Sequence, residues 1–502
     1  MTGALRVDAV IVGAGFAGIA QALALREAGV ESFVIVERAG RVGGTWRDNT
    51  YPGIACDVPS HLYSLASHPS PAWSRVFAPG HEIQAYLEKI VADEGLGSHI
   101  LFDTALSAAR WSGSDWAVET TGRGPGRIVS DHLVLAAGRL TEPRIPAIPG
   151  LATFGGALFH SARWDHEAAG PAGLAGRRVA VVGTGASAIQ LVPELARLGA
   201  RVTLFQRSPA WIVPRGDHPI DAADRARFAA DPAALAAHRA ELLAEGEARL
   251  ASRSGDPVES ARMRGVALAH LARQVADPAL RAALTPDYAF GCKRVLLSDD
   301  FYPALASGAV TLEPSALAEV RGGELVAASG ARYEADMIVL ATGFETTRQP
   351  YAGLVTGEGD KTLAAHWSEG MTAVASTLVP GFPNLYVLNG PNASLGHNSS
   401  VLLSEAQAET AAALIAERVT APFAFPGPVR VTADAERAAT ADIARRAALT
   451  PWLTGGCANW YVDDRSGRLT LLWPGSVSDF RARLTRARRE ASPALQNEGT
   501  SS

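Results

Sequence analysis

The stretch VDAVIVGAGFAG, residues 7–18, decides the fold of the N-terminal part of the chain. It is a continuous apolar run that ends on Gly13-x-Gly15-x-x-Gly18 and leads into the helix-forming sequence FAGIAQALALREAG. An apolar run without alternation is expected of a strand buried on both faces of a parallel sheet. The glycines allow a tight turn, a close approach of backbone to a pyrophosphate and close helix–sheet packing. We therefore expect a strand–turn–helix unit that holds a dinucleotide at the helix N-terminus.

The residues after this unit favour FAD as the first dinucleotide. Glu37 ends the second strand, ESFVIVE, 19 residues after Gly18, and an acidic residue there suits a ribose with free hydroxyl groups, as in FAD or NAD. The motifs GTW (44–46) and YPG (51–53) and then Asp57 suit a flavin ring beyond the ADP portion. A surface loop rich in Gly and Pro is the alternative interpretation of these motifs. The residues that we expect to bind FAD are Gly13, Gly15, Phe16, Gly18, Glu37, Arg38, Gly44, Thr45, Trp46, Asp57 and Tyr63.

A second strand–turn–helix–strand unit, RRVAVVGTGASAIQLVPELARLGARVTLFQR, covers residues 177–207. Its fingerprint is Gly183-x-Gly185-x-x-Ala188, and its second strand ends on Arg207 where the first unit has an acidic residue. A guanidinium there replaces recognition of the 2′-hydroxyl by binding of a 2′-phosphate, which favours NADPH over NADH. The alternative is an ordinary surface arginine. The residues that we expect to bind this nucleotide are Gly183, Thr184, Gly185, Ser187, Gln190, Gln206, Arg207 and Lys293.

Composition excludes several classes of protein. The 502 residues carry a net charge of −5, so no broad basic field exists to attract nucleic acid. The longest stretch without Asp, Glu, Lys or Arg, residues 370–404, is interrupted by three prolines and cannot form one membrane helix. The three cysteines, Cys56, Cys292 and Cys457, lie far apart and predict no metal site, no redox dithiol and no disulfide. We therefore expect a reducing, cytoplasmic compartment.

The sequence predicts an α/β fold with two Rossmann-like dinucleotide-binding domains and a helical insertion. Strand-like runs that close on glycine, LVLAAG (133–138) and MIVLATGF (337–344), are expected in the two sheets. The segment between residues 217 and 286 is rich in Ala, Leu, Glu and Arg, which are strong helix formers. We expect an FAD domain from residues 1–145 and 346–502, an NADP domain from 146–214 and 290–345, and the insertion at 215–289.

The segment before the second unit reads Phe154-x-Gly156-x-x-x-His160-x-x-x-Trp164-Asp165. Taken alone, a single histidine is more often a structural hydrogen-bonding group than a catalyst. With the motif that runs from Gly44 to Asp57 and with ATGF (341–344), however, the chain resembles the type I Baeyer–Villiger monooxygenases. The resemblance covers most of the chain and is weakest in the helical insertion and the last hundred residues.

This resemblance implies a catalytic pair and a reaction. The segment Lys293-Arg294 to Phe301-Tyr302 matches the family segment that carries the catalytic arginine, so Arg294 is expected to face the flavin and Asp57 to pair with it. The implied activity is NADPH- and O2-dependent insertion of one oxygen next to a ketone carbonyl through a C4a-peroxyflavin. A permanently charged guanidinium suits the stabilisation of the anions in that reaction. The resemblance also implies that His160 belongs to a hinge between domains.

The C-terminal region departs from the family pattern. Many members carry a tryptophan there that touches the nicotinamide ribose, followed by a glycine-rich loop. Here the tryptophan is Trp460, in NWYVDD (459–464), and the loop is missing, so its role is open. The segment GPNASLGHNSS (390–400) precedes a helix and suits either a flavin contact or a capped surface helix.

Two other functions remain as alternatives at this stage. One is a flavin monooxygenase that oxygenates nitrogen or sulfur, against which Trp164 and the Lys293-Arg294 segment argue. The other is a flavoprotein reductase or oxidase that passes electrons to a partner. For the leading function the substrate is a small ketone, which can be aliphatic, cyclic or aryl, and sulfide oxidation is a further possibility.

Overall fold

The first sheet lies in the lobe that contains the N-terminus. The computed structural model describes residues 4–492, without the side chains of residues 171 and 172. Strand β1 (Leu5–Val12) pairs in parallel with β2 (Phe33–Val36) and with β6 (Arg127–Leu135). The complete order is β17 (Val355–Thr356), β4 (Thr104–Trp111), β5 (Trp116–Gly122), β6, β1, β2 and β3 (Ile100–Leu101), and β18 (Leu385–Val387) also pairs with β6. Strands from both ends of the chain therefore build one sheet.

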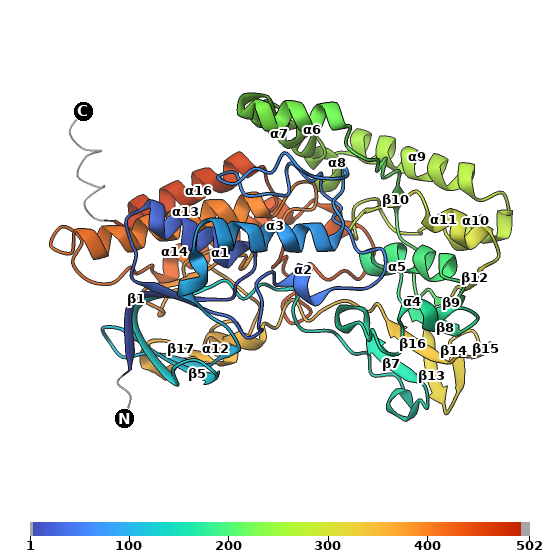
Figure 1. Cartoon of the computed structure of the whole chain (residues 1–502), viewed down its shortest axis with the longest axis horizontal. Helices are drawn as coiled ribbons and strands as arrows, with labels where there is room; N and C mark the ends of the chain where they lie inside the picture. Colours follow the sequence, from blue (N-terminus) through green and yellow to red (C-terminus); the bar gives the residue numbers. More distant parts are fainter. Residues whose placement is uncertain (1–3, 493–502) are drawn as a thin grey trace.

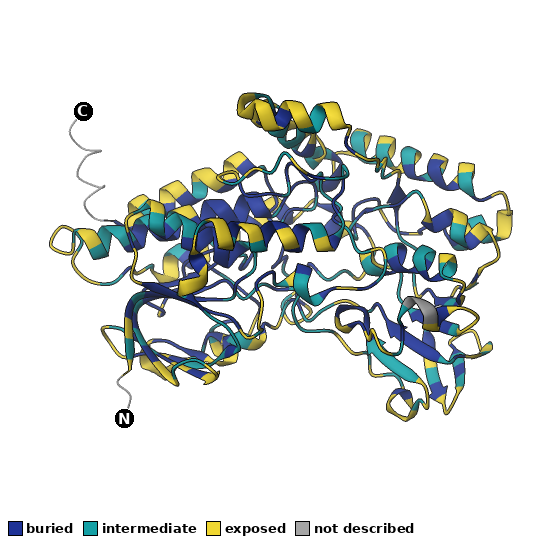
Figure 2. Cartoon of the chain, viewed as in Figure 1, coloured by how far each residue is buried: buried dark blue, intermediate teal, exposed yellow. Residues whose placement is uncertain are grey.

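Long helices pack together beside this sheet. Helix α1 (Phe16–Glu27) contacts α13 (Val401–Thr420), which in turn contacts α16 (Val477–Ala491). Figure 1 shows these three helices with α3 (Gly80–Asp93) above β1, and Figure 2 shows that their inward faces are buried. Twelve residues of α13 are buried, which is expected of a helix enclosed by neighbours on several sides.

The second sheet has five strands, all parallel. Its order is β12 (Val310–Glu313), β9 (Arg201–Phe205), β8 (Arg178–Val182), β16 (Met337–Leu340) and β7 (Ala157–His160). Helix α5 (Ala186–Arg197) connects β8 to β9, and α4 (Pro171–Leu174) and α11 (Phe301–Ala306) belong to the same lobe. A three-stranded antiparallel sheet of β13 (Leu317–Arg321), β14 (Glu324–Ala327) and β15 (Arg332–Glu334) lies beside it (Figure 1). The prediction of two α/β units is confirmed.

The predicted insertion is helical, and its sequence shows why. Three of its helices begin after Asp231, Asp256 and Asp277, whose carboxylates accept hydrogen bonds from first-turn amides, and each is followed by Pro at the first helical position. Both residues favour a helix start at that place. The helices are α6 (Ala222–Ala230), α7 (Pro232–Ala248), α8 (Leu250–Ser254), α9 (Pro257–Gln274) and α10 (Pro278–Ala283). Parallel pairing of β10 (Ile212–Val213) with β11 (Leu296–Leu297) closes the insertion at its base.

The chain crosses between the two lobes along two paired segments. Arg144 N–H donates to the Gly343 carbonyl at 2.8 Å, and Glu345 N–H donates to the Glu142 carbonyl at 2.9 Å. Because the two crossings hydrogen-bond to each other, they form a short ribbon between the two lobes.

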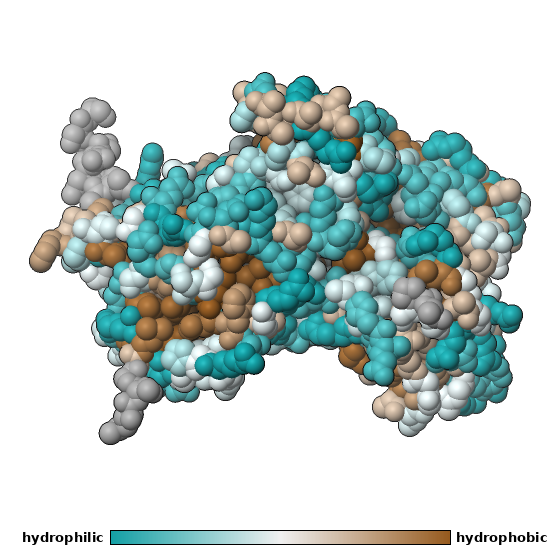
Figure 3. Space-filling model, in the orientation of Figure 1, coloured by the Kyte–Doolittle hydropathy of each residue, from teal (hydrophilic) through white to brown (hydrophobic). Residues whose placement is uncertain are grey.

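The remaining helices and the surface complete the fold. The helices are α2 (Thr45–Asp48), α12 (Leu363–His366), α14 (Ala433–Ala447) and α15 (Pro451–Thr454). Figure 3 shows hydrophilic residues over most of one face, with apolar residues gathered over the lobe that holds the first sheet. Within residues 4–492, no helix has the length and apolar character needed to cross a bilayer.

Candidate active site

The first glycine turn has the geometry of a dinucleotide cradle. Gly13 has φ +105°, and a Cβ there would lie 2.7 Å from the Ala136 carbonyl oxygen. A Cβ on Gly18 would lie 1.9 Å from the Gly13 oxygen, so only glycine lets α1 approach the turn this closely. Gly15 is the N-cap of α1 and supplies no side-chain cap. The first-turn amides of α1 are therefore available to a phosphate group.

Glu37 lies at the end of β2, beside this turn. Its carboxylate accepts hydrogen bonds from Ala14 N–H and Ala39 N–H, each at 2.9 Å, and from Arg47 at 2.8 Å. The side chain is thus fixed at the edge of the cradle, where a ribose would lie. The neighbouring Arg38 is half-exposed and pairs with Glu142 at 2.8 Å.

The second FAD motif packs directly against the first. A Cβ on Gly44 would come within 3.3 Å of the Gly15 Cα, and Gly44 is the N-cap of α2, which begins at Thr45. Trp46 Nε1–H donates to the Tyr63 hydroxyl at 3.2 Å, and the Tyr63 ring lies 5.1 Å from the Phe16 ring. The structure therefore joins small residues and an aromatic group at the start of α1, as a flavin site requires, and the motif is not an isolated surface loop.

The second glycine turn repeats the first. Gly183 has φ +112°, and a Cβ there would lie 2.5 Å from the Ala341 carbonyl oxygen. Gly185 is the N-cap of α5, again without a side-chain cap. Thr184 Oγ1 donates to the Ser208 carbonyl at 2.8 Å and fixes the turn to the end of β9. Ser187 lies in the first turn of α5.

Arg207 and Lys293 gather at the end of β9. Arg207 is exposed, while Lys293 Nζ donates to the Ser208 hydroxyl at 2.6 Å and lies over the Tyr288 ring. Burial lowers the pKa of Lys293, and the positive charge of Arg207 lowers it further. Two cations and a hydroxyl group at one place fit a phosphate group.

Two glutamines of the predicted nucleotide site have protein partners. Gln190 Nε2–H donates to the Ala55 carbonyl at 2.9 Å, and its oxygen accepts from the Tyr51 hydroxyl at 3.0 Å. It thereby links α5 to the loop of the first lobe. Gln206 is buried and donates to the Ala283 carbonyl at 2.8 Å, which links β9 to the insertion.

Arg294 and Asp57 form an ion pair between the two lobes. Arg294 Nε and Nη2 both donate to Asp57 Oδ2, at 2.9 Å and 2.6 Å. The pKa of Arg294 is raised above its ordinary value, chiefly by the charge of Asp57. The guanidinium is therefore permanently charged and held in one orientation. Both side chains are partly exposed, at 30% and 27%, so the pair is open to a ligand.

The residues of the predicted hinge lie next to the crossing ribbon. His160 ends β7 opposite Leu340, the last residue of β16, and its ring lies 5.6 Å from that of Phe344. Burial lowers the pKa of His160 to about 4, so it is neutral at physiological pH. Trp164 packs on Phe159. Earlier in the same motif, a Cβ on Gly156 would lie 2.8 Å from the Phe154 ring.

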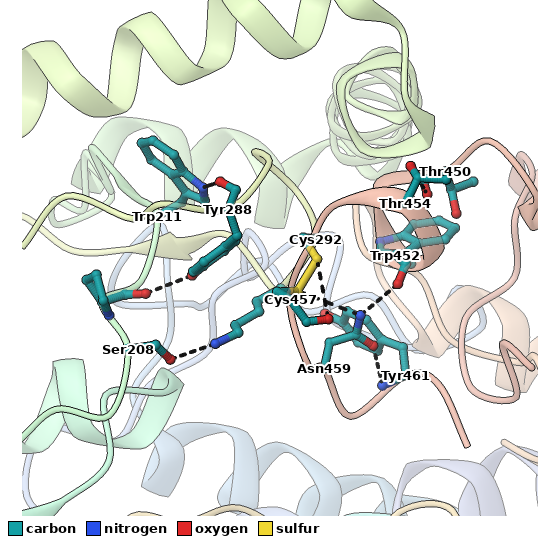
Figure 4. The surroundings of a disulfide bond; sticks show 12 residues. Ser208, Trp211, Tyr288, Cys292, Thr450, Trp452, Thr454, Cys457, Asn459 and Tyr461 are labelled. Carbon is teal, nitrogen blue, oxygen red and sulfur yellow. Dashed lines mark hydrogen bonds between the residues drawn. A yellow bond between two sulfur atoms is a disulfide. The ribbon is translucent and has the colours of Figure 1, made fainter. Parts of the chain in front are cut away.

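The prediction that the cysteines form no disulfide is wrong. Cys292 and Cys457 form a disulfide bond across a sequence separation of 165 residues (Figure 4). Sequence spacing gave no signal, because the folding of two distant segments against each other creates the pair. Ala289 N–H also donates to the Gly455 carbonyl at 2.9 Å. The segment before Arg294 is thus joined twice to the C-terminal segment.

The C-terminal segment places Tyr461, which sequence reasoning did not select, next to Arg294. Asn459 fixes the local turn, since its amide donates to the Trp452 carbonyl at 2.8 Å and its oxygen accepts from Tyr461 N–H at 3.0 Å (Figure 4). Burial raises the pKa of Tyr461 to about 12, and the charge of Arg294 opposes that rise. The Trp460 ring contacts the Tyr461 ring in a tilted arrangement, with 4.6 Å between the ring centres. The adjacent Trp460 was the only signal for this position.

Two units in which a glycine turn joins parallel strands to a helix meet at a charged pair, and together they define an oxidoreductase that binds two nucleotides. In agreement, residues 10–221 match the family described as pyridine nucleotide-disulphide oxidoreductase. The chain is 44% identical over 481 residues to a Baeyer–Villiger monooxygenase of Streptomyces coelicolor, which covers 95% of this chain and 90% of the relative. A Baeyer–Villiger monooxygenase of Pseudomonas aeruginosa is 38% identical over 95% of this chain and 89% of its own length.

Solved structures agree with these relatives. An oxidised steroid monooxygenase bound to NADP superimposes with a TM-score of 0.83 at 29% identity, over 97% of this chain and 99% of the other. Cyclohexanone monooxygenase from Rhodococcus sp. Phi1 bound to NADP+ gives 0.84 at 25% identity, over 98% and 99%. The chain belongs to the Baeyer–Villiger monooxygenase family.

Proposed function

We propose that the protein is a flavoprotein monooxygenase that inserts one atom of O2 next to a ketone carbonyl and gives an ester or lactone. The observation that carries this proposal is the Arg294–Asp57 ion pair at the junction of the two nucleotide-binding units. Overall, NADPH, a proton, O2 and the ketone give NADP+, water and the ester. FAD, when bound and reduced by NADPH, supplies the chemistry that activates O2.

The first lobe fits FAD. The amides at the start of α1 would hold the pyrophosphate, Glu37 would accept hydrogen bonds from the ribose hydroxyls, and the aromatic group at Phe16, Trp46 and Tyr63 would border the flavin. The close approach of Gly15 and Gly44 supports this placement, because side chains at either position would fill the cradle.

The second lobe fits NADPH. The amides at the start of α5 would hold its pyrophosphate, while Arg207, Ser208 and Lys293 would hold the 2′-phosphate. The proposed division of the chain follows: residues 1–145 and 346–502 for FAD, 146–214 and 290–345 for NADPH, and 215–289 for the insertion.

Arg294 would act on the carbonyl group of the substrate. As a fixed cation it can stabilise the negative charge that develops on the carbonyl oxygen when oxygen attacks the carbon. Asp57 orients the guanidinium, so that less reorganisation is needed during the reaction. His160 is neutral and buried, which supports a structural role at the crossing ribbon and not proton transfer.

A panel of neutral ketones, sulfides and amines tests this function. Each is incubated with the yellow holoenzyme, NADPH and O2, and the products are identified by mass spectrometry. We expect esters or lactones from at least one ketone. Robust amine oxygenation with no ketone product would favour the alternative, a flavin monooxygenase of nitrogen or sulfur, and NADPH consumption that yields only hydrogen peroxide would favour an oxidase.

The proposed partners are a small ketone and O2, without nucleic acid. A net charge of −5 supports the absence of a nucleic-acid partner. We propose a cytoplasmic location, which the need for NADPH supports. The cytoplasm contains a pool of reducing thiols, and Cys292 of the disulfide is buried. Cell fractionation checks the location.

A further inference from the structure

Arg253, in the helical insertion, is a buried cation without a carboxylate partner. Its relative exposure is 7%. Among the described residues, no Asp or Glu lies within ion-pair distance of it, and its Nε is buried without a hydrogen-bond partner. Its one hydrogen bond is long, 3.3 Å from Nη1 to the hydroxyl of its neighbour Ser252. A guanidinium has five N–H donors, so most of its donor capacity is unused by the protein.

The backbone places Arg253 next to Phe290 and Gly291, which lead into Arg294. A Cβ on Gly291 would lie 3.8 Å from the Arg253 Cα, and the Arg253 guanidinium lies 4.9 Å from the centre of the Phe290 ring. Helix α8 therefore packs on the residues that lead directly into Arg294. At the same C-terminal end of α8, Gly255 lies against the Leu449 carbonyl of the C-terminal segment.

Two unsatisfied groups, Arg253 and the Tyr461 hydroxyl, lie near Arg294 at this junction. The Tyr461 hydroxyl is buried without a hydrogen-bond partner within residues 4–492, and its phenol is close enough to interact electrostatically with both Arg253 and Arg294. Burial lowers the pKa of Arg253 to about 10, and the positive charges of Arg249 and Arg294 lower it further, so the group is still protonated at neutral pH. Asp57 compensates the charge of Arg294, while no carboxylate within residues 4–492 pairs with Arg253.

A buried cation without a partner is costly, and an anionic ligand removes that cost. We propose that Arg253 binds an anionic group of the substrate, so that the enzyme prefers ketones that carry a carboxylate. This inference rests on the proposed function, because it places the ketone carbonyl at Arg294 and the carboxylate at Arg253. An arginine suits that task, since its fork matches the two oxygens of a carboxylate.

The kinetic test compares a cyclohexanone that carries a carboxylate with its methyl ester. The wild-type holoenzyme has the higher kcat/KM for the acid. Arg253→Met, which keeps the apolar stem over Phe290, lowers kcat/KM for the acid about 10- to 100-fold through KM and leaves that for the ester within about twofold. Arg253→Lys retains part of the preference. The matched control is Arg262→Met, because Arg262 is an exposed arginine of the insertion that pairs with Glu259 at 2.8 Å.

A phosphate of NADPH is the other source of an anion, and the same variants distinguish the two. An unchanged KM for NADPH in Arg253→Met supports the substrate assignment. A rise in that KM, with the acid-to-ester ratio unchanged, overturns it and assigns Arg253 to the nucleotide. Equal losses for the acid and the ester also overturn it, because they indicate a structural role.

A binding measurement separates this inference from the proposed function. Cyclohexanecarboxylate and its methyl ester are titrated into the oxidised holoenzyme, and the change in flavin absorbance is followed. Tighter binding of the carboxylate that Arg253→Met abolishes supports the anion site even if no ketone is oxygenated. Equal binding of both probes overturns the anion site even if neutral ketones are oxygenated.

Discussion

The two nucleotide-binding units have the same backbone path and differ in the residue that follows the second strand. After β2, Glu37 is buried and held by the backbone N–H groups of Ala14 and Ala39. After β9, Arg207 is exposed, and Lys293 lies close by in space although it is distant in sequence. We propose that the turn binds a dinucleotide in both units, and that the charge beside it determines which ribose is accepted.

The largest expected effect is on the rate of ketone oxygenation, and it comes from a substitution at the junction between the two nucleotide-binding units. Arg294→Met should lower the rate of ketone oxygenation by about 10²- to 10³-fold, because the carbonyl oxygen loses its stabilising cation. Reduction of the flavin by NADPH, followed by stopped-flow absorbance under anaerobic conditions, should change little. A variant that forms ester at the wild-type rate would remove Arg294 from the mechanism.

The next largest expected effect is on the KM for the nucleotide, and it tests the second nucleotide-binding unit alone. Arg207→Ala should raise the KM for NADPH about 10- to 100-fold and that for NADH at most about twofold, since only NADPH carries the phosphate that loses a charge-assisted hydrogen bond. Steady-state kinetics with both nucleotides checks this result. Arg201→Ala, at the opposite end of β9, is the matched control. Equal rises in both KM values would defeat the assignment of a 2′-phosphate site.

The corresponding substitution in the first unit should have a smaller effect, which is on the affinity for FAD. Glu37→Gln keeps the shape of the side chain but loses one acceptor oxygen and the negative charge, so FAD should bind about tenfold more weakly. Flavin fluorescence after dilution of the holoenzyme measures the FAD released. The exposed pair of Glu31 with Arg26 makes Glu31→Gln the control. If FAD is retained as in the wild type and NADPH binding weakens instead, the two units have been assigned in the wrong order.

Local sequence patterns were sufficient to predict the parts of this fold that depend on neighbouring residues. The turns at Gly13 and Gly183 and the helical character of residues 217–286 were inferred from local sequence, and the Arg294–Asp57 pair was implied by the resemblance to the family. The Cys292–Cys457 disulfide and the position of Arg253 depend on segments that only the tertiary fold brings together. Because such contacts join residues that are far apart in the sequence, no motif of fixed spacing predicts them. Gln190 and Gln206 show the same limit, because their amides have partners on distant segments.

The smallest expected effect concerns stability, and it involves one buried histidine in each unit. Burial lowers the pKa of His132 on β6 to about 3 and that of His160 to about 4. Both lie below the ordinary value of 6.5, so the unfolded chain takes up protons first as the pH falls. Their contribution to stability is complete above pH 6.5 and is lost progressively between about pH 6.5 and pH 3.

Thermal unfolding of the holoenzyme at several pH values checks this prediction. The melting temperature should fall as the pH decreases below 6.5. The slope should be shallower for His132→Asn, which cannot take up that proton, while His218→Gln at the surface should leave it unchanged. An identical slope in His132→Asn and the wild type would contradict the role of His132.

The central claim is that the two units meet to oxygenate a ketone. The most direct measurement is turnover of a neutral cyclic ketone with NADPH under isotopically labelled O2, with the product analysed by mass spectrometry. The account predicts a lactone that contains one labelled oxygen atom for each NADPH consumed. A lactone without the label, or NADPH consumption in which all of the label is found in hydrogen peroxide, would contradict it.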